Sequence, residues 1–275
     1  MVISVSRRCD IPRFQFAWFM NRLNEGFVET VNPYNAGQIR RVSLLPEDVD
    51  AFVFWTRDPG DILDNTEELS NRGYPFYVMV SLTDYPELLE PNMAPAAEVL
   101  KSMKELAKII GPSRVIWRYD PIIFTSVTDI DFHRRNFYQL AQNLTGSVGR
   151  VIVSIYDDYQ KAKKRLEKLE QDKKLKMLSI DRFCLNSDFH NLLADLAKNA
   201  EAAGMEIQSC AEREDFSSLG IKPGACIDAA LINKMCAQEF TGKDKNQRPG
   251  CLCCKSADIG AYNACNAHCV YCYAS

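Results

Sequence analysis

Three cysteines near the end of the chain have a spacing that suits metal chemistry. Cys265, Cys269 and Cys272 form a C-x3-C-x2-C sequence on one short segment. Thiolates at this spacing can ligate three irons of a cubane [4Fe–4S] cluster and leave the fourth iron open to another ligand. Zinc is the alternative, because His268 or Cys254 could supply the fourth ligand that a closed zinc site needs. The spacing alone therefore indicates a metal site and leaves the metal open.

The other cysteines are concentrated in the same part of the chain. Nine of the eleven lie between Cys210 and Cys272, and only Cys9 and Cys184 lie before them. An odd number of cysteines, in a chain of 275 residues that can form a core without cross-links, argues against a disulfide framework. The first residues reach two arginines too early for the apolar region of a signal peptide, and no run approaches the roughly 18 apolar residues of a membrane span. We therefore expect a cytoplasmic protein with reduced thiols and no membrane partner.

Short apolar strands and amphipathic helices alternate through the rest of the chain. The expected strands are Val2–Ser6, Phe27–Val31, Ala51–Trp55, Phe76–Leu82, Arg114–Tyr119, Arg150–Tyr156, Met205–Ser209 and Asp258–Tyr262. The expected helices are Phe14–Asn24, Asp61–Asn71, Ala96–Ile110, Asp131–Leu144, Tyr159–Asp172 and Phe189–Ala203. This alternation predicts an α/β fold with a parallel sheet, and about eight strands in this length is the size of a (β/α) barrel.

We predict a full or partial barrel over residues 1–212. The Cys-rich segment, residues 213–275, returns to the barrel as its last strand and metal-binding loop, so that the chain forms one integrated domain. An open doubly wound sheet is the alternative, but the glycine-rich nucleotide-binding motifs of that fold are absent from the sequence.

Arginine and aspartate residues follow three of the predicted strands. They are Arg8 and Asp10, Arg57 and Asp58, and Arg118 and Asp120. Barrel enzymes build their sites at this end of the strands, and such pairs could bind carboxylate, phosphate or ribose groups. Equally, each aspartate could cap the next helix and each arginine could form a structural ion pair.

The overall charge gives no sign of a nucleic-acid partner. The formal net charge is −3, and a polyanion-binding protein is usually basic. Only the segment Lys161–Lys176, with eight basic and three acidic residues, could contact phosphates. A solvated lysine-rich helix face is the more common explanation of such a segment.

The residues around the three cysteines resemble a known loop. C-x3-C-x2-C with an aromatic residue, Tyr271, before the last cysteine is similar to the signature of the radical S-adenosylmethionine (radical SAM) superfamily. The longer sequence YNACNAHCVYCYA is similar to the loop of the spore photoproduct lyase, or "DNA repair photolyase", branch. Over nearly its whole length the chain resembles the DUF1848 family, through SRRCDIP, VNPYN, VFWTRDP, WRYDPI, SCAE, ACID, QRPGCLC and DIGAYNACNAHCVYCYA.

The resemblance implies a [4Fe–4S] cluster on Cys265, Cys269 and Cys272, with S-adenosylmethionine as the second cofactor. In the superfamily the loop follows the first strand, whereas here it follows the last. We therefore expect a circularly permuted barrel in which Asp258–Tyr262 lies beside Val2–Ser6.

The superfamily's Gly-Gly-Glu motif, which holds the methionyl amine, is absent from this sequence. By resemblance we expect Asp10, Arg8 or Asp58 to replace it. Residues expected to line the rest of the cofactor site are Tyr271, Tyr273, Asn263, Arg57, Arg118 and Asp120.

The family-like cysteines outside the loop are Cys210, Cys226, Cys251 and Cys253. Four thiolates with no open position suit a second, fully ligated [4Fe–4S] cluster. A structural zinc site is the alternative, as is simple burial for Cys226. Cys236 lies in an apolar helical stretch and is expected to pack in the core.

These features together predict a radical SAM enzyme with an unknown reaction. Its expected partners are a flavodoxin- or ferredoxin-like electron donor and a small-molecule substrate rather than a nucleic acid. The alternatives are a non-catalytic iron–sulfur or zinc protein, and a photolyase-like enzyme that acts on nucleic acid.

Overall fold

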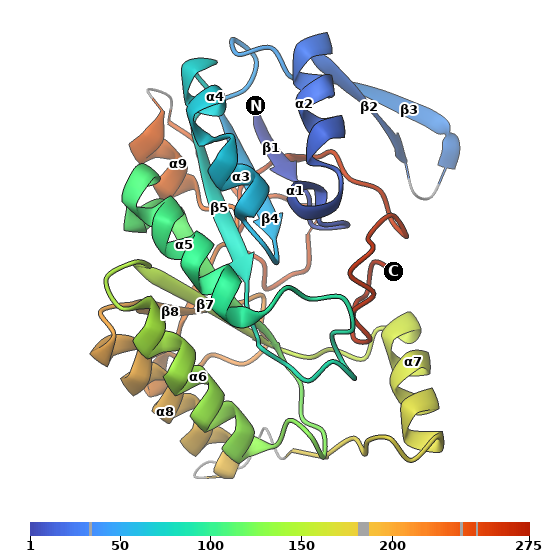
Figure 1. The fold of residues 1–275 in the computed structure, drawn as a ribbon, viewed down its shortest axis with the longest axis vertical. Coiled ribbons are helices and arrows are strands. Elements are labelled where there is room, and N and C mark those ends of the chain that lie inside the picture. The colour runs from blue at the N-terminus through green and yellow to red at the C-terminus, as the bar shows by residue number, and fades with distance from the viewer. Residues whose placement is uncertain (33–34, 181–186, 237–238, 246) are drawn as a thin grey trace.

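A sheet of eight parallel strands forms the centre of the molecule (Figure 1). The computed structural model describes residues 1–32, 35–180, 187–236, 239–245 and 247–275. The strand order is β10-β1-β4-β5-β6-β7-β8-β9. The strands are β1 Val2–Val5, β4 Ala51–Thr56, β5 Phe76–Ser81, β6 Val115–Ile122, β7 Arg150–Ile155, β8 Glu206–Cys210, β9 Lys222–Gly224 and β10 Ala257–Asp258. The predicted α/β fold with a parallel sheet is therefore confirmed.

Most of the helices cover one face of this sheet. The exceptions are α9, which lies on the opposite face, and α7, which packs against the C-terminal loop. The helices are α1 Ile11–Phe14, α2 Phe16–Glu25, α3 Gly60–Asp64, α4 Thr66–Asn71, α5 Ala96–Ile110, α6 Ile130–Leu144, α7 Gln160–Gln171, α8 Asp188–Ala202 and α9 Ala229–Met235. Buried aromatic residues such as Phe19 of α2, Phe137 of α6 and Phe189 of α8 pack with strand side chains into the largest apolar core. Figure 1 shows α5, α6 and α8 side by side along this outer face. In the described ranges no helix is long and apolar enough to cross a membrane.

The opposite, inner face is covered by the Cys-rich segment instead. Side chains alternate between the two faces of a strand, so Val53, Tyr77 and Ile152 point away from the helical layer. They form a second apolar cluster with Ile227, with α9 and with four cysteines between residues 226 and 254. The hydroxyl of Tyr77 donates a hydrogen bond to Cys226 O at 2.6 Å, which fixes the segment to the middle of the sheet.

The last strand lies beside the first, as the permuted arrangement requires. β10 pairs in parallel with β1, with Ile3 opposite Ala257 and Ser4 opposite Asp258. A closed barrel is not formed, however, because β9 and β10 are the two edges of the sheet and do not pair with each other among the described residues. These strands have three and two residues, and the segment between them fills the inner face rather than extending the ladder. The sheet is therefore open.

One predicted strand belongs elsewhere. β2 Phe27–Asn32 pairs antiparallel with β3 Asn35–Ser43 in a two-stranded sheet of its own, which projects from the body beside α2 (Figure 1). The prediction that Phe27–Val31 is a barrel strand was wrong. In β2 only Val28 is fully buried, which suits a hairpin and not the interior of a parallel sheet.

The helix boundaries follow local signals in most cases. α5 has the predicted bounds, and Gly26 adopts a left-handed conformation with φ of 76° where α2 ends. The predicted helix Asp61–Asn71 is divided at Asn65 into α3 and α4. β9 was not predicted, because a Lys-Pro-Gly sequence is a poor strand signal and is tolerated only at a sheet edge.

Candidate functional site

The carboxyl end of β10 is tied to the segment after β1. The carboxylate of Asp258 accepts hydrogen bonds from Ser4 Oγ at 2.9 Å, Ser6 Oγ at 2.6 Å and Arg7 N at 2.9 Å. Two residues on, a Cβ at Gly260 would lie 2.1 Å from Oγ of Ser6 and 2.8 Å from Sγ of Cys9, so only glycine fits there. The chain after β10 therefore starts at the carboxyl edge of the sheet, beside Arg8 and Asp10.

The three loop thiols, Cys265, Cys269 and Cys272, lie on the segment that Figure 1 draws in red near α1 and α7. Cys269 is buried, and the other two are partly exposed. Burial raises the pKa of Cys269 to about 11, against the influence of the Arg57 guanidinium. Burial also raises the pKa of Cys265, while backbone hydrogen bonds from Asp10 and Ala267 oppose that rise.

Cys272 has a backbone donor too, since Ala274 N donates to its Sγ at 3.3 Å. Hydrogen bonds from N–H groups to sulfur favour the thiolate, which is the form that ligates a metal. Two of the three loop thiols thus have such donors before any ligand is considered.

A buried network lies beneath the loop. Arg57 Nη1 forms an ion pair with Glu90 Oε1 at 2.8 Å, and both side chains are nearly enclosed. The Tyr271 hydroxyl accepts a hydrogen bond from Arg57 Nη2 and donates one to Glu90, and Thr83 donates to the same carboxylate. Burial would lower the pKa of Arg57, but the nearby Glu90 carboxylate raises it well above its usual range. The network fixes the stretch between Cys269 and Cys272.

Asp10 links the start of α1, the segment after β4 and the loop thiol Cys265. Its carboxylate accepts a hydrogen bond from Arg57 N at 2.8 Å and another from Arg13 N at 3.1 Å, which caps α1. Burial raises the pKa of Asp10 to about 6, although hydrogen bonds from Arg57, Thr56 and Arg13 oppose the shift. Asp10 is therefore both a helix cap and a buried carboxylate next to Cys265.

Helix α7 holds the outer side of the loop. Arg165 donates to three loop carbonyls: Nε to Val270 O at 2.8 Å, Nη1 to Ser275 O at 2.7 Å, and Nη2 to Cys272 O. Lys161 Nζ donates to Asn263 Oδ1 at 2.8 Å. The basic segment Lys161–Lys176 was predicted to be a solvated face or a phosphate contact. Two of its side chains instead bind the protein's own loop.

Several predicted cofactor residues gather on the accessible side of the loop. Tyr273 is 41% exposed, and its hydroxyl donates to Arg7 O at 2.7 Å. Arg8 donates to Gly260 O at 3.3 Å and lies 5.0 Å from the centre of the Tyr262 ring. Asn263 is exposed as well. Tyr271 is separate from this group, because it is buried in the network beneath the loop.

The other predicted residues have structural partners. Asp58 accepts a hydrogen bond from Gly60 N at 3.0 Å, in a local turn just before α3. Arg118 and Asp120 form an ion pair with each other, and Asp120 also accepts a hydrogen bond from Ser154 Oγ at 2.5 Å. The structural interpretation offered for the Arg and Asp residues therefore holds where Asp10 caps α1 and where Arg118 pairs with Asp120.

The four inner thiols, Cys210, Cys226, Cys251 and Cys253, come together on the inner face. Sγ of Cys210 lies 3.2 Å from Sγ of Cys226. Hydrogen bonds with the thiols of Cys226 and Cys251 lower the pKa of Cys253, and Ile227 N donates to its Sγ at 3.3 Å. The structure therefore brings together a set that is spread over more than forty positions.

The inner thiols contact one another and do not surround an empty centre. In the described ranges, no three Cys, His, Asp or Glu side chains are arranged around a point as ligands of one metal ion. The geometry thus contains no preformed site for a single ion, and any metal at either set of thiols requires their side chains to move.

The remaining cysteines and histidines have packing partners where the structure describes them. The Cys236 thiol donates to Asp50 O at 2.8 Å. Burial raises the pKa of Cys9 to about 11. His133 lies between Tyr119 and Ile123 O in the outer core. Cys184 is outside the described residues.

Sequence reasoning missed three residues of the site. Glu90 lies in a long connection without a motif, and nothing in its neighbourhood marks it as buried. Asp258 begins the DIGAYNAC stretch, so a signal was present there. Arg165 is the single arginine in α7. An arginine among lysines can indicate a structural role, because the planar guanidinium group can donate hydrogen bonds to several carbonyls at once.

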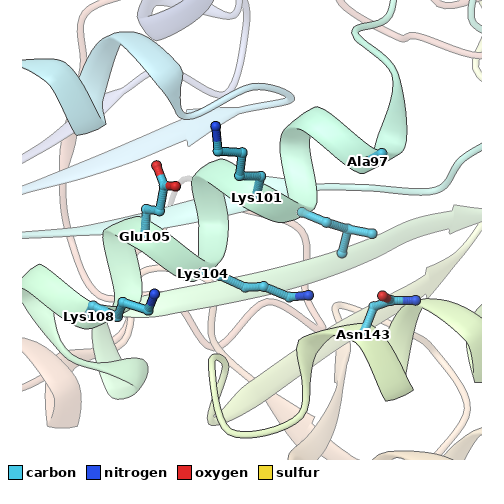
Figure 2. A pocket seen from close by; sticks show the side chains of 7 residues that line it. Ala97, Lys101, Lys104, Glu105, Lys108 and Asn143 are labelled. Carbon is cyan, nitrogen blue, oxygen red and sulfur yellow. The ribbon is translucent and has the colours of Figure 1, made fainter.

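The structure also has a surface depression away from the thiols. It lies on the helical layer, between α5 and the end of α6, and has a volume of about 470 Å³. Figure 2 shows the side chains of Lys101, Lys104 and Lys108 along α5 and Asn143 across from them. Lys101 and Lys108 are exposed, as expected of a solvated helix face, so we assign this depression no chemistry.

Comparison with known proteins agrees with the resemblance noted from the motifs. A search of curated proteins gave no match. The family model described as "Domain of unknown function (DUF1848)" matches residues 2–274, which is nearly the whole chain. This protein therefore belongs to the DUF1848 family.

Proposed function

We propose that this protein is a radical SAM enzyme in which the loop thiols hold a [4Fe–4S] cluster. The observation that carries the proposal is the parallel pairing of β10 with β1. It starts the C-x3-C-x2-C loop at the carboxyl edge of the sheet, beside the segment after β1. That position is equivalent to the one expected for a superfamily loop that follows the first strand. We further propose that the open sheet is a partial, circularly permuted (β/α) barrel.

The donor set of the loop suits such a cluster. Three thiols on one short segment supply three ligands, and backbone N–H groups point at two of the sulfurs. Three thiolates suit a cluster that keeps one iron open, whereas a closed zinc site would need a fourth protein ligand. When bound, the cluster would supply the one-electron chemistry that cleaves a carbon–sulfur bond of S-adenosylmethionine reductively.

The buried network positions the loop. Arg57 is neutralised by Glu90, so we assign it the role of holding Tyr271 and not that of binding an anion. Tyr271 is itself between two ligand positions, and any movement of its ring would shift Cys269 and Cys272.

Two residues remain as candidates for the methionyl group of S-adenosylmethionine. Asp10 caps α1 but also lies beside a loop thiol, which no contact in the described part of the chain shows for Asp58, so we assign Asp10 to the amine and Arg8 to the carboxylate. Asp10 lies next to Cys265, and Arg8 lies over Tyr262 on the accessible side of the loop. Tyr273 and Asn263, on that same side, are our candidates for contacts with the adenosine group.

A small-molecule substrate suits the surface better than a nucleic acid does. The formal net charge is −3, and Arg165 and Lys161 of the basic helix bind the loop. A reducible cluster requires a reduced compartment, so we propose a cytoplasmic location and a flavodoxin- or ferredoxin-like electron donor.

The test uses protein that is purified and reconstituted with iron and sulfide in the absence of oxygen. It is incubated with S-adenosylmethionine and dithionite, and mass spectrometry follows the nucleoside products. We expect 5′-deoxyadenosine from the unmodified protein and none from Cys269→Ala. Methylthioadenosine in its place would mean that a different carbon–sulfur bond breaks. The absence of both products, with no iron bound to the loop thiols, would refute the proposal.

A further inference from the structure

The inner thiols form a buried group that the proposed reaction does not use. Cys226, Cys251 and Cys253 are each less than a tenth exposed, and they come from two segments on either side of α9. Cys210 joins them from the end of β8. Four free thiols in contact, in a protein whose apolar residues could have filled the same volume, need a chemical explanation.

Positive charge surrounds this group. The Arg7 guanidinium interacts electrostatically with Cys253, Cys226 and Cys251, and that of Arg118 interacts with Cys210 and Cys226. Both guanidinium groups lie over Trp55, with centroid distances of 5.5 and 4.9 Å. Neutral thiols would gain little from such neighbours, whereas thiolates would be stabilised by them.

The same neighbours include donors that have no acceptor. Arg7 Nη2, Arg118 Nε and Trp55 Nε1 are buried and have no hydrogen-bond partner. A buried donor without a partner costs free energy, and most such groups in folded proteins are satisfied. Thiolate sulfurs, or the sulfides of a cluster, would provide acceptors in this region.

Tetrahedral geometry requires only a small change at the closest pair of thiols. A zinc–sulfur bond of about 2.3 Å places ligand sulfurs about 3.8 Å apart. Sγ of Cys210 and Sγ of Cys226 are 3.2 Å apart, so this pair would have to separate by about 0.6 Å to match that spacing. An iron–sulfur cluster would require a wider separation of the same four sulfurs.

We propose that Cys210, Cys226, Cys251 and Cys253 are the four ligands of a second metal centre, closed to exogenous ligands and enclosed on the inner face of the sheet. Binding forms four metal–sulfur bonds and releases the four thiol protons, with no net oxidation or reduction of either the metal or the protein. The shared chemistry is tetrathiolate ligation, and the metal is either one zinc ion or a [4Fe–4S] cluster. Arg7 supplies positive charge beside the bound centre, and Arg118, which is also paired with Asp120, lies near it.

The test separates this centre from the loop. In a triple variant, Cys265→Ala, Cys269→Ala and Cys272→Ala remove all three loop thiols, so that any metal retained cannot be theirs. The full-length variant is purified without oxygen, before and after reconstitution with iron and sulfide, and its zinc and iron are measured by mass spectrometry. We expect one zinc or four irons per chain. Adding Cys226→Ala should reduce that content at least tenfold, and adding Cys236→Ala, a thiol outside the group, should leave it unchanged.

A labelling experiment identifies the ligands without altering them. The triple variant is alkylated with iodoacetamide before and after the metal is removed by a chelator, and each cysteine peptide is quantified. We expect the four inner thiols to be protected at least tenfold when metal is bound, and Cys236 to be labelled equally in both states. This measurement decides the matter even where Cys226→Ala does not fold.

Two results would overturn the proposal. One is a folded triple variant that holds neither zinc nor iron, including one in which Cys210 and Cys226 have formed a disulfide. The other is bound metal that leaves the labelling of the inner thiols unchanged. Neither result depends on cleavage of S-adenosylmethionine, so the two proposals fail independently.

Discussion

The two groups of thiols differ in how the fold assembles them. The loop thiols lie within residues 265–272, and two of the three are partly exposed at the carboxyl edge of the sheet. The inner thiols come from three segments, and three of the four are buried on the inner face. The loop thiols are close together in sequence and lie at an accessible edge of the sheet. The inner thiols come together only when the sheet has formed.

This difference fits two different uses. A reactive centre must admit a cofactor and a substrate, so at least one side of it has to remain accessible. A centre with four protein ligands needs no access and benefits from enclosure, because burial excludes competing ligands and oxidants. Polar side chains at the edge and apolar ones around the inner thiols are consistent with that division.

The largest effect should come from Cys269→Ala. We expect the loop to lose its iron and nucleoside production to fall below about 1% of that of the unmodified protein, because a missing ligand leaves the cluster with two. Metal at the inner thiols should be unaffected. Parallel loss of both metals would mean that the two groups form one unit.

Glu90→Gln tests the support of the loop. Removing the carboxylate leaves Arg57 buried without a counter-charge, which typically costs about 3–5 kcal/mol. Urea unfolding should show this loss of stability. The matched control is Glu68→Gln, since Glu68 pairs with Arg72 at the surface and such pairs contribute about 1 kcal/mol or less. Equal effects of the two substitutions would contradict a buried role for Glu90.

If both thiol groups depend on the same sheet, acid should expose the loop thiols and the inner thiols over the same pH range. Burial lowers the pKa of His133 to about 4, so as pH falls the unfolded state takes up a proton near its ordinary value of about 6.5 before the folded state does. The contribution of His133 to stability is therefore fully present above about pH 6.5 and falls by up to about 3 kcal/mol between there and pH 4. The raised pKa of Asp10 contributes in the opposite direction between about pH 6 and pH 4, so the His133 contribution is measured as the difference between the unmodified protein and the His133 variant.

The measurement is urea unfolding as a function of pH, with thiol labelling at both groups. His133→Gln should remove this loss of stability from the profile, while His190→Gln, at a partly exposed position, should not. Exposure of the loop thiols well before the inner thiols would show that the groups are not linked through the core.

Arg165→Lys should weaken the loop selectively. Lysine keeps the charge but cannot donate to three carbonyls in one plane. We expect the loop to bind iron about 10–100-fold less tightly, which is the usual effect of losing a residue that orients metal ligands. Lys164→Arg, at an exposed position on the same helix, is the control. An unchanged iron affinity in Arg165→Lys would show that α7 does not position the loop.

Tyr273→Phe should have the smallest effect. It removes one hydrogen bond to Arg7 O, and a single bond of this kind contributes about 1 kcal/mol. Since Arg7 also faces the inner thiols, a change in metal affinity at the inner thiols would reveal coupling between the groups. Thermal unfolding and metal competition measure the two quantities separately.

Local patterns predicted the parts of the fold that depend on neighbours in sequence. α5 has the predicted bounds, and the strands around Phe54, Val78 and Val153 were predicted from their continuous apolar runs. The β2–β3 hairpin was misassigned, because a half-buried strand has the same residue types in either kind of sheet. Closure of the barrel could not be predicted, since it depends on what fills the inner face.

The candidate site was predictable to the same extent. The loop thiols were found from spacing, and the inner thiols from a family resemblance. Glu90 was not found, because its burial results from a connection that folds over the sheet edge. Asp58 and Asp10 were assigned from the same Arg and Asp pattern, yet Asp58 only closes a local turn before α3, whereas Asp10 caps α1 and also faces Cys265. Only tertiary structure separates these two outcomes.

The pairing of β10 with β1 affects the order in which the protein folds. The hydrogen bond from Ser4 to Asp258 joins residues 254 positions apart, so β1 is synthesised long before its partner strand. Contacts of such sequence separation form late in folding, after local helices and neighbouring strands. The loop thiols reach Arg57 and Glu90 only at that stage. Insertion of the proposed cluster at the edge of the sheet would therefore be a late event, and a chain in which β10 has not yet paired would expose its cysteines without the residues that surround them in the folded protein.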